Sequence, residues 1–122
     1  MAYKIHKNDT GIIEAIYSGG VDLNERKMAV DEVCELVNYP DPVRLLIDVR
    51  NITMEMSLKE QKYFGKYLAG REELVNAKVA VLHNPRSNPN VFINAYAYIE
   101  GYQVVDFDDQ NNAISWLTGE MK

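Results

Sequence analysis

The sequence predicts an α/β fold: a single domain with a mixed five-stranded sheet flanked by about four helices. Two extended segments at the start of the chain are separated by a short turn, which indicates an antiparallel hairpin. Strand and helix patterns then alternate to the end of the chain, as they do where helical crossovers join parallel strands. Because no linker or internal repeat interrupts these patterns, residues 1–122 are expected to form one domain.

The hairpin comes first in the chain. Apolar and polar side chains alternate over residues 3–7, as in a half-buried strand. Residues 8–11 read Asn-Asp-Thr-Gly, which is typical of a turn, and residues 12–17 predict the second strand. The glycine pair Gly19 and Gly20 is expected to end this strand.

The first helix is predicted from its capping residues. Asp22 and Glu25 have the spacing of a capping box, and apolar residues follow at helical spacing. Because proline cannot continue a helix, this one is expected to stop near Asn38, ahead of Pro40 and Pro42.

The remaining elements follow from similar signals. Residues 45–49 read Leu-Leu-Ile-Asp-Val, an apolar run typical of a strand covered on both faces. Ser57 and Glu60 repeat the capping spacing at the start of a helix that extends to Leu68. The patterns then predict a strand at 79–82, a loop at 84–89, a helix carrying Phe92, Ala95, Tyr96 and Ile99, a strand at 103–107, and a short helix capped by Asp108 or Asp109.

The composition excludes several classes of partner. The chain carries a net charge of −5 and no cluster of Lys or Arg, so nucleic acid is not an expected partner, because its binding depends on phosphate neutralisation. No apolar run reaches the roughly 20 residues that cross a bilayer, so an integral membrane protein is not expected. Cys34 is the only cysteine and no apolar leader opens the chain, so a cytoplasmic location is expected.

Three parts of the chain carry a resemblance to a known family: residues 44–53, residues 78–83, and the tail formed by residues 102–109 and 113–117. In order and pattern they resemble the STAS domain family, in the branch called SpoIIAA-like or STAS/SEC14-like. The resemblance implies the fold of anti-sigma factor antagonists and a non-enzymatic regulatory or protein-interaction module, with a protein partner such as a kinase-like regulator. As an alternative, its SEC14 side implies a binder or carrier of a small apolar or lipid-like ligand.

One motif departs from the family. STAS antagonists carry Asp-Ser-Ser-Gly where a serine is phosphorylated, and this chain reads Met56-Ser57-Leu58-Lys59. Ser57 falls on the first serine, and Leu58 falls on the phosphoacceptor. The module is therefore expected to lack the usual phosphoserine, and Ser57 is better explained as the cap of its helix than as a phosphoacceptor or anion site.

Two segments supply candidate contacts with a ligand or partner. One is the exit of the central strand, where methionines either line an adaptable groove or belong to the core. The other is the loop between two prolines, where an arginine and amides either bind an anion or cap the next helix. The candidates are Asn51, Met54, Met56, Ser57, Asn84, Arg86 and Ser87.

No catalytic residue, cofactor or metal site is predicted. Ser57, His83 and Asp48 all lie near strand ends, but no Gly-x-Ser-x-Gly motif surrounds the serine. The adjacent carboxylates of Asp108 and Asp109 are explained by a helix start, and the chain has no His/Cys cluster with zinc spacing.

Tyrosines supply candidate interface residues. Tyr63 and Tyr67 are four residues apart, as are Tyr98 and Tyr102, so each pair is expected on one helical stripe. Such stripes suit a protein interface, and a homodimer is the expected assembly. The alternative is that the rings pack within the domain while their hydroxyls reach water.

Overall fold

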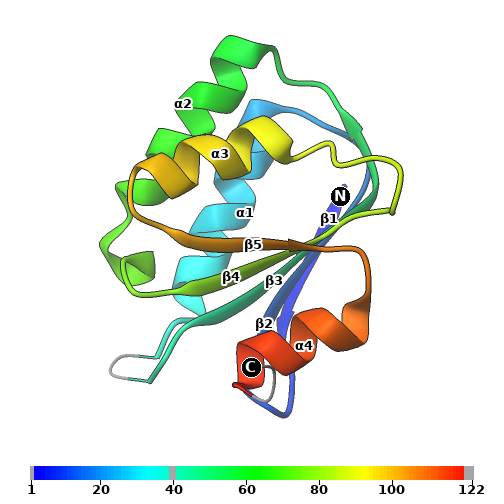
Figure 1. The fold of residues 1–122 in the computed structure, drawn as a ribbon. Helices are drawn as coiled ribbons and strands as arrows, with labels where there is room; N and C mark the ends of the chain where they lie inside the picture. Colours follow the sequence, from blue (N-terminus) through cyan, green and yellow to red (C-terminus); the bar gives the residue numbers. More distant parts are fainter. Residues whose placement is uncertain (1, 39–40, 120–122) are drawn as a thin grey trace.

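The computed structural model describes residues 2–38 and 41–119, which form a five-stranded mixed sheet (Figure 1). The strands are β1 (Tyr3–Lys7), β2 (Ile13–Val21), β3 (Arg44–Met54), β4 (Lys78–Leu82) and β5 (Gln103–Phe107). Their order in the sheet is their order in the sequence. β1 pairs antiparallel with β2, and each later pair of neighbours is parallel. The predicted fold class, a hairpin followed by parallel βα units, is confirmed.

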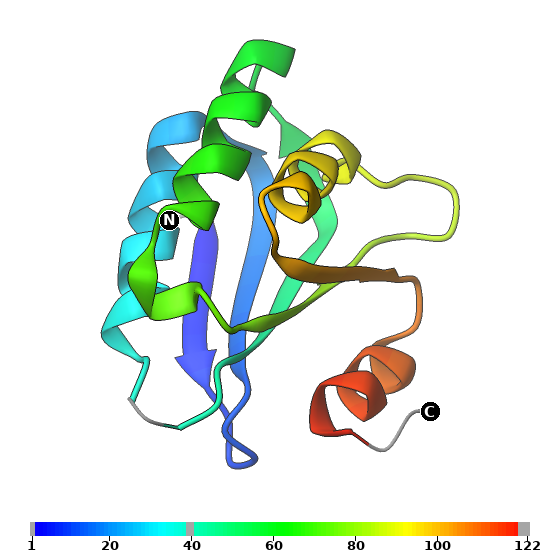
Figure 2. The ribbon, with the colours of Figure 1, turned by 60° about the vertical axis from the view of Figure 1, so that its left-hand side comes forward.

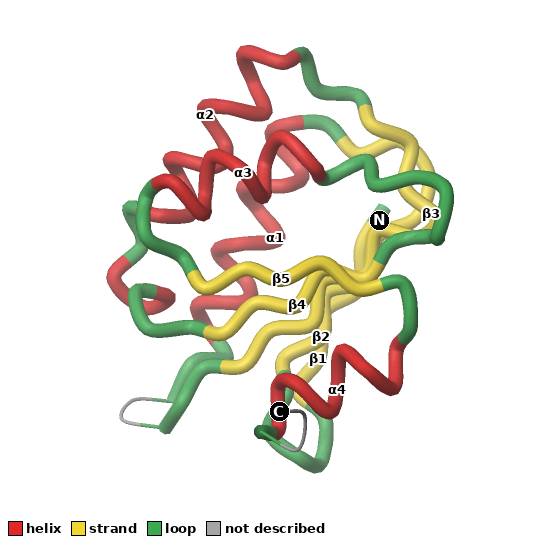
Figure 3. Tube along the Cα trace, in the orientation of Figure 1, coloured by secondary structure: helices red, strands yellow, loops and turns green. Residues whose placement is uncertain are grey.

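Helices lie on both faces of the sheet. Three of them, α1 (Leu23–Glu35), α2 (Leu58–Ala69) and α3 (Val91–Ile99), cover one face. The fourth, α4 (Gln110–Thr118), covers the other face (Figure 2). A short 3-10 turn, η1 (Glu72–Leu74), separates α2 from β4 and was not expected from the sequence. Figure 3 shows the three-helix layer and the single helix on opposite sides of the strands.

The central strand β3 is covered on both faces over its first half, as its apolar run predicted. Leu45 is buried in the large core beneath α1, α2 and α3. Its neighbour Leu46 points the other way and is buried with Ala113 and Leu117 of α4. Alternate side chains of one strand therefore supply both hydrophobic cores.

A β-bulge changes the side-chain alternation in the second half of β3. The register between β2 and β3 moves from Ile16 opposite Asp48 to Ser18 opposite Asn51, so β3 contains one extra residue. Beyond the bulge, Ile52 pairs with β2 and packs against the large core. The bulge keeps the apolar residues of β3 on the α1–α3 face and lets the strand continue to Met54.

Capping residues start three of the helices, as predicted. The side chain of Asp22 accepts a hydrogen bond from the backbone of Glu25 at 2.9 Å. Ser57 and Glu60 form a full capping box, with N–H···O distances of 3.1 and 2.9 Å in the two directions. Asp109 caps α4. An N-cap of this kind contributes about 1 kcal/mol to helix stability.

Two predicted boundaries are wrong. The glycine pair does not end β2, because Gly19 and Gly20 pair with the extension of β3 and the strand continues to Val21. Gly19 has a φ of +72°, a conformation that glycine adopts without strain. α1 ends at Glu35, earlier than expected, and Pro40 lies outside the described residues.

Candidate functional site

The middle of β3 and the carboxyl end of β4 bring Asp48, Arg50 and Asn84 together. The Asp48 carboxylate accepts from Arg50 Nη2 at 2.8 Å and from Nε at 3.1 Å. The hydrogen bonds that Arg50 donates to this carboxylate hold the pKa of Arg50 above its ordinary value. The Asn84 side chain donates to the carbonyl of Arg50 at 2.7 Å. These contacts join the middle of β3 to the loop after β4, and both oxygens of the Asp48 carboxylate accept hydrogen bonds from Arg50.

Each of the three side chains that could form a triad, Ser57, His83 and Asp48, has a polar partner within three residues in the sequence. Ser57 Oγ accepts from the backbone of Glu60, and Asp48 is paired with Arg50. Nδ1 of His83 lies 2.6 Å from the backbone oxygen of the next residue. Among the described residues, no hydrogen bond joins any two of these three side chains. Their arrangement gives no support to a catalytic triad.

The candidates in the loop after β4 lie at the surface. Asn84 and Ser87 close a turn, in which the Ser87 N–H donates to the Asn84 carbonyl at 3.1 Å. The Arg86 side chain between them is exposed. Anion binding by this loop stays a prediction.

The candidates at the exit of β3 separate into surface and core. Asn51 and Ser57 are exposed, Met54 is half-buried, and Met56 is buried in the large core. Leu58, which stands where STAS antagonists have their phosphoacceptor, is 60% exposed. This segment therefore has an exposed apolar side chain beside a helix cap.

The first tyrosine pair lies between α1 and α2. Tyr67 donates a hydrogen bond to the Asp31 carboxylate at 3.0 Å, and Arg71 pairs with the same carboxylate. Lys27 Nζ lies 5.4 Å from the ring centre of Tyr63 and 5.0 Å from that of Tyr67. Hydrogen bonds from Arg71 and Tyr67 lower the pKa of Asp31. These tyrosines thus join two helices of one molecule, and Tyr63 remains half exposed.

The expectation that Tyr98 and Tyr102 share a helical stripe is wrong. α3 ends at Ile99, so Tyr102 lies beyond the helix. Tyr102 is buried, and its hydroxyl donates to the carbonyl of Leu68 at 3.0 Å. Burial raises its pKa. Tyr98 is 69% exposed and remains an interface candidate.

The outer face of α3 is apolar. The stripe predicted from the sequence faces outward, with the side chains of Phe92 and Ile99 exposed. The inward positions are instead Ile93, Asn94 and Ala97. We call the exposed set the α3 stripe; it consists of Val91, Phe92, Ala95, Tyr98 and Ile99.

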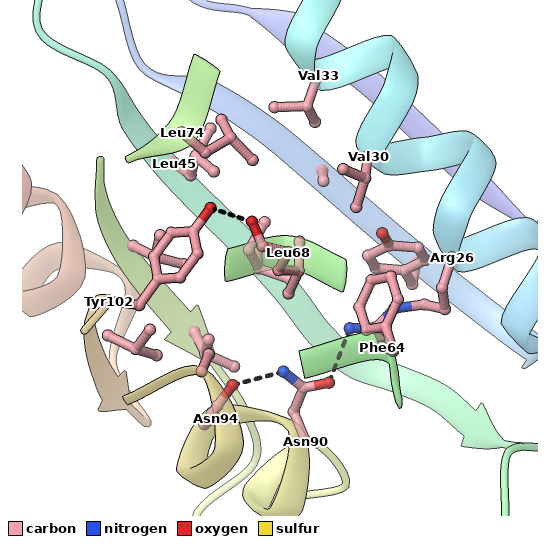
Figure 4. A pocket seen from close by; sticks show the side chains of 17 residues that line it. Arg26, Val30, Val33, Leu45, Phe64, Leu68, Leu74, Asn90, Asn94 and Tyr102 are labelled. Atoms are coloured by element: carbon pink, nitrogen blue, oxygen red, sulfur yellow. Dashed lines mark hydrogen bonds between the residues drawn. The ribbon is translucent and has the colours of Figure 1, made fainter. Parts of the chain in front are cut away.

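A small internal cavity lies between the sheet and the three-helix layer (Figure 4). Its volume is about 50 Å³, and its walls are mostly apolar side chains of β2–β5 and the covering helices. Of the predicted site residues, Tyr102 alone lines it. The cavity also reaches the polar side chains of Arg26, Asn90 and Asn94, none of which is a candidate predicted from the sequence.

Arg26 is a buried cation. It is 2% exposed, and Nη2 donates to Asn90 Oδ1 at 2.9 Å. The guanidinium carbon lies 4.6 Å from the ring centre of Tyr17 and 4.9 Å from that of Phe64. Within residues 2–38 and 41–119, Nε and Nη1 have no hydrogen-bond partner. Burial lowers the pKa of Arg26, although a guanidinium stays charged in proteins.

An amide relay runs from Arg26 to the molecular surface. Asn90 accepts from Arg26 and donates to Asn94 Oδ1 at 2.6 Å. Asn94 in turn donates to the carboxylate of Asp106, which is exposed on β5. Since the arginine can only donate and the carboxylate can only accept, the orientation of both amides is fixed. The relay therefore links a buried positive charge to a surface negative charge through two neutral groups.

One sequence signal could have identified Arg26. The inward stripe of α1 includes Leu23, Val30 and Val33, and helical spacing requires a further inward residue between the first two. Arg26 occupies that position. An arginine at the core-facing position of a helix needs a partner or a function, because charged side chains are almost never fully buried alone.

None of the helices in the described residues is both long and apolar enough to cross a membrane. In the same ranges, no three side chains of His, Cys, Asp or Glu gather as metal ligands would.

Comparison with known proteins supports the fold. No family model and no curated protein matches this sequence. Among solved structures, the chain is similar to an uncharacterised protein of the DUF3478 family with a SpoIIAA-like fold from Shewanella loihica PV-4. The two are 15% identical with a TM-score of 0.61, over 95% of this chain and 92% of that one. At that identity the likeness shows the fold alone: this protein has a SpoIIAA-like fold, as the resemblance implied.

Proposed function

We propose that this protein is a non-enzymatic interaction module that binds a second copy of itself through the α3 stripe. One observation carries the proposal: α3 contains no charged residue, its outer face is apolar, and its inner face is apolar except for Asn94. A helix that is hydrophobic all round is normally buried all round. The domain covers only the inner face, so the outer face is available for a partner.

The chemistry of the stripe favours a second copy as the partner. Two copies related by a two-fold axis would cover apolar side chains with apolar side chains and bury no charge. Antiparallel pairing of the two helices would also place Glu100, which follows α3, near the positive N-terminal end of the partner's helix. Tyr98 supplies an aromatic ring with a polar tip, a residue type enriched at interfaces.

The test is the molar mass measured by light scattering over a hundredfold dilution series. The wild type is expected to pass from dimer to monomer, and a Phe92→Ser, Ile99→Ser variant is expected to be monomeric throughout. Val75→Ser is the matched control, because Val75 is 67% exposed but lies outside α3. A wild type that stays monomeric at its highest concentration would overturn the proposal.

A regulatory role of the kind seen in anti-sigma factor antagonists would operate here without the usual phosphoacceptor. Leu58 has no hydroxyl, and the neighbouring Ser57 oxygen accepts a hydrogen bond within its capping box. A partner would therefore recognise an unmodified surface at this helix start. A kinase-like regulator as that partner stays a prediction.

The internal cavity favours a second candidate function, the binding of a small ligand. Its size limits that ligand, because a cavity of about 150 Å³ is what accommodates benzene in an engineered protein. A cavity of about 50 Å³ is too small for a lipid chain. The carrier function is therefore proposed for a ligand of only a few atoms.

A further inference from the structure

Among the described residues, the buried guanidinium of Arg26 has no ionic partner. Asn90 and the two aromatic rings offer it a single neutral acceptor and two π-faces. In residues 2–38 and 41–119, no carboxylate forms an ion pair with it. The nearest carboxylate along its hydrogen-bond network, Asp106, is separated from it by two amides. Burying a charge is costly unless a counter-charge compensates for it.

The cavity that Arg26 lines has the size of a small organic ion. At about 10–15 Å³ for each water-sized position, a volume of about 50 Å³ corresponds to about three to five non-hydrogen atoms. Away from the guanidinium, its wall consists of aliphatic side chains, including Leu74, Val79 and Val81. One end of the cavity is therefore cationic and the other is apolar.

We propose that this cavity binds a short-chain carboxylate of the size of acetate or propionate, whose negative charge compensates the buried positive charge of Arg26, one of the residues that line the cavity. The aliphatic walls would enclose its methyl or ethyl group. Carboxylate is the anion that a guanidinium fork matches best in shape, and one carboxylate balances one buried positive charge. This inference makes the second candidate function specific, and it does not depend on the α3 stripe.

Neighbouring classes of ligand fit less well. A phosphate dianion would leave one negative charge uncompensated, because Arg26 is the cation that lines the cavity. A fatty acid exceeds the volume. A neutral molecule of the same size would leave the guanidinium without a counter-charge, so it should bind more weakly than its carboxylate counterpart.

The experiment is a titration of the purified protein with sodium propionate, followed by NMR of the Arg26 Nε–H signal and by thermal unfolding. Sodium chloride at equal ionic strength controls for salt, and propionamide controls for shape without charge. Propionate is expected to shift the Arg26 signal in a saturable way and to raise Tm, while chloride does neither. Arg26→Met is expected to weaken binding by at least about 30-fold, and Arg86→Met, which changes an exposed arginine, is expected to leave it unchanged.

A second variant keeps the proposal testable if Arg26→Met unfolds. Asn90→Asp would place a carboxylate against the guanidinium, since Asn90 Oδ1 already lies 2.9 Å from Nη2. We expect this built-in anion to abolish propionate binding. If propionamide binds as tightly as propionate, the carboxylate class is wrong while ligand binding stands. If no probe binds, or if Asn90→Asp leaves propionate affinity unchanged, the proposal is overturned.

Discussion

Replacing Arg26 by methionine tests whether its charge is compensated within the protein. The change removes one hydrogen bond to a charged group, which contributes about 1.5–3 kcal/mol, and contacts with two aromatic rings of about 2 kcal/mol when desolvated. It also removes the desolvation cost of a buried ion, which is several kcal/mol. These terms oppose each other, so we expect the free energy of unfolding to change by less than about 2 kcal/mol in either direction.

The assay is urea unfolding in carboxylate-free buffer, followed by circular dichroism. An m value equal to that of the wild type would confirm that the variant exposes the same amount of surface on unfolding. Val30→Ala is the matched control, because Val30 is buried on the same face of α1, and we expect it to lose about 2 kcal/mol. A loss of about 3–5 kcal/mol for Arg26→Met, as when one member of a buried ion pair is removed, would refute the reasoning.

Three further predictions concern local structure. Ser57→Ala should lower the free energy of unfolding by about 1 kcal/mol in urea unfolding, and Ser57→Gly by only a few tenths, because glycine is tolerated at a helix N-cap. Gly65→Ala should lower it by about 1–3 kcal/mol, because a Cβ there would lie 2.7 Å from a side-chain carbon of α3; an unchanged urea midpoint would show that the helices can separate. The pKa of Asp31 is lower in the folded state, so the ionised carboxylate stabilises the fold above its unfolded pKa of about 3.9, and this stabilisation is lost as pH falls through the folded pKa. Asp31→Asn should therefore make the free energy of unfolding depend less steeply on pH in the acid range. A slope equal to that of the wild type would contradict this.

The element order was predictable because each element is specified locally. At Asp22 and at Ser57, the helix begins where a side-chain oxygen accepts a hydrogen bond from the backbone N–H three residues later. The capping residue and its spacing are visible in the sequence. In residues 45–49, apolar side chains do not alternate with polar ones, which indicates that the strand is buried on both faces of the sheet. The extension of β2 and β3 was not predictable, because pairing between the strands and a β-bulge, rather than local propensity, determine where they end.

The site was less predictable than the fold. In α3 the outward residues are as apolar as the inward ones, so periodicity could not tell which face meets the sheet. Asn90 and Asn94 are common loop and cap residues, and only the fold places them beside Arg26. Tyr102 was assigned to a helical pair because its spacing from Tyr98 fits a helix, although α3 ends between the two.

The amide relay also bears on the order of folding. Arg26 and Asn90 are 64 residues apart in the chain, and Asn94 and Asp106 come from two further elements. Such a contact requires α3 and β5 to be in place first, because loop-closure entropy opposes it until shorter-range contacts exist. The arginine would then remain hydrated until late in folding and lose its water last. Substitutions along the relay should therefore speed unfolding far more than they slow folding.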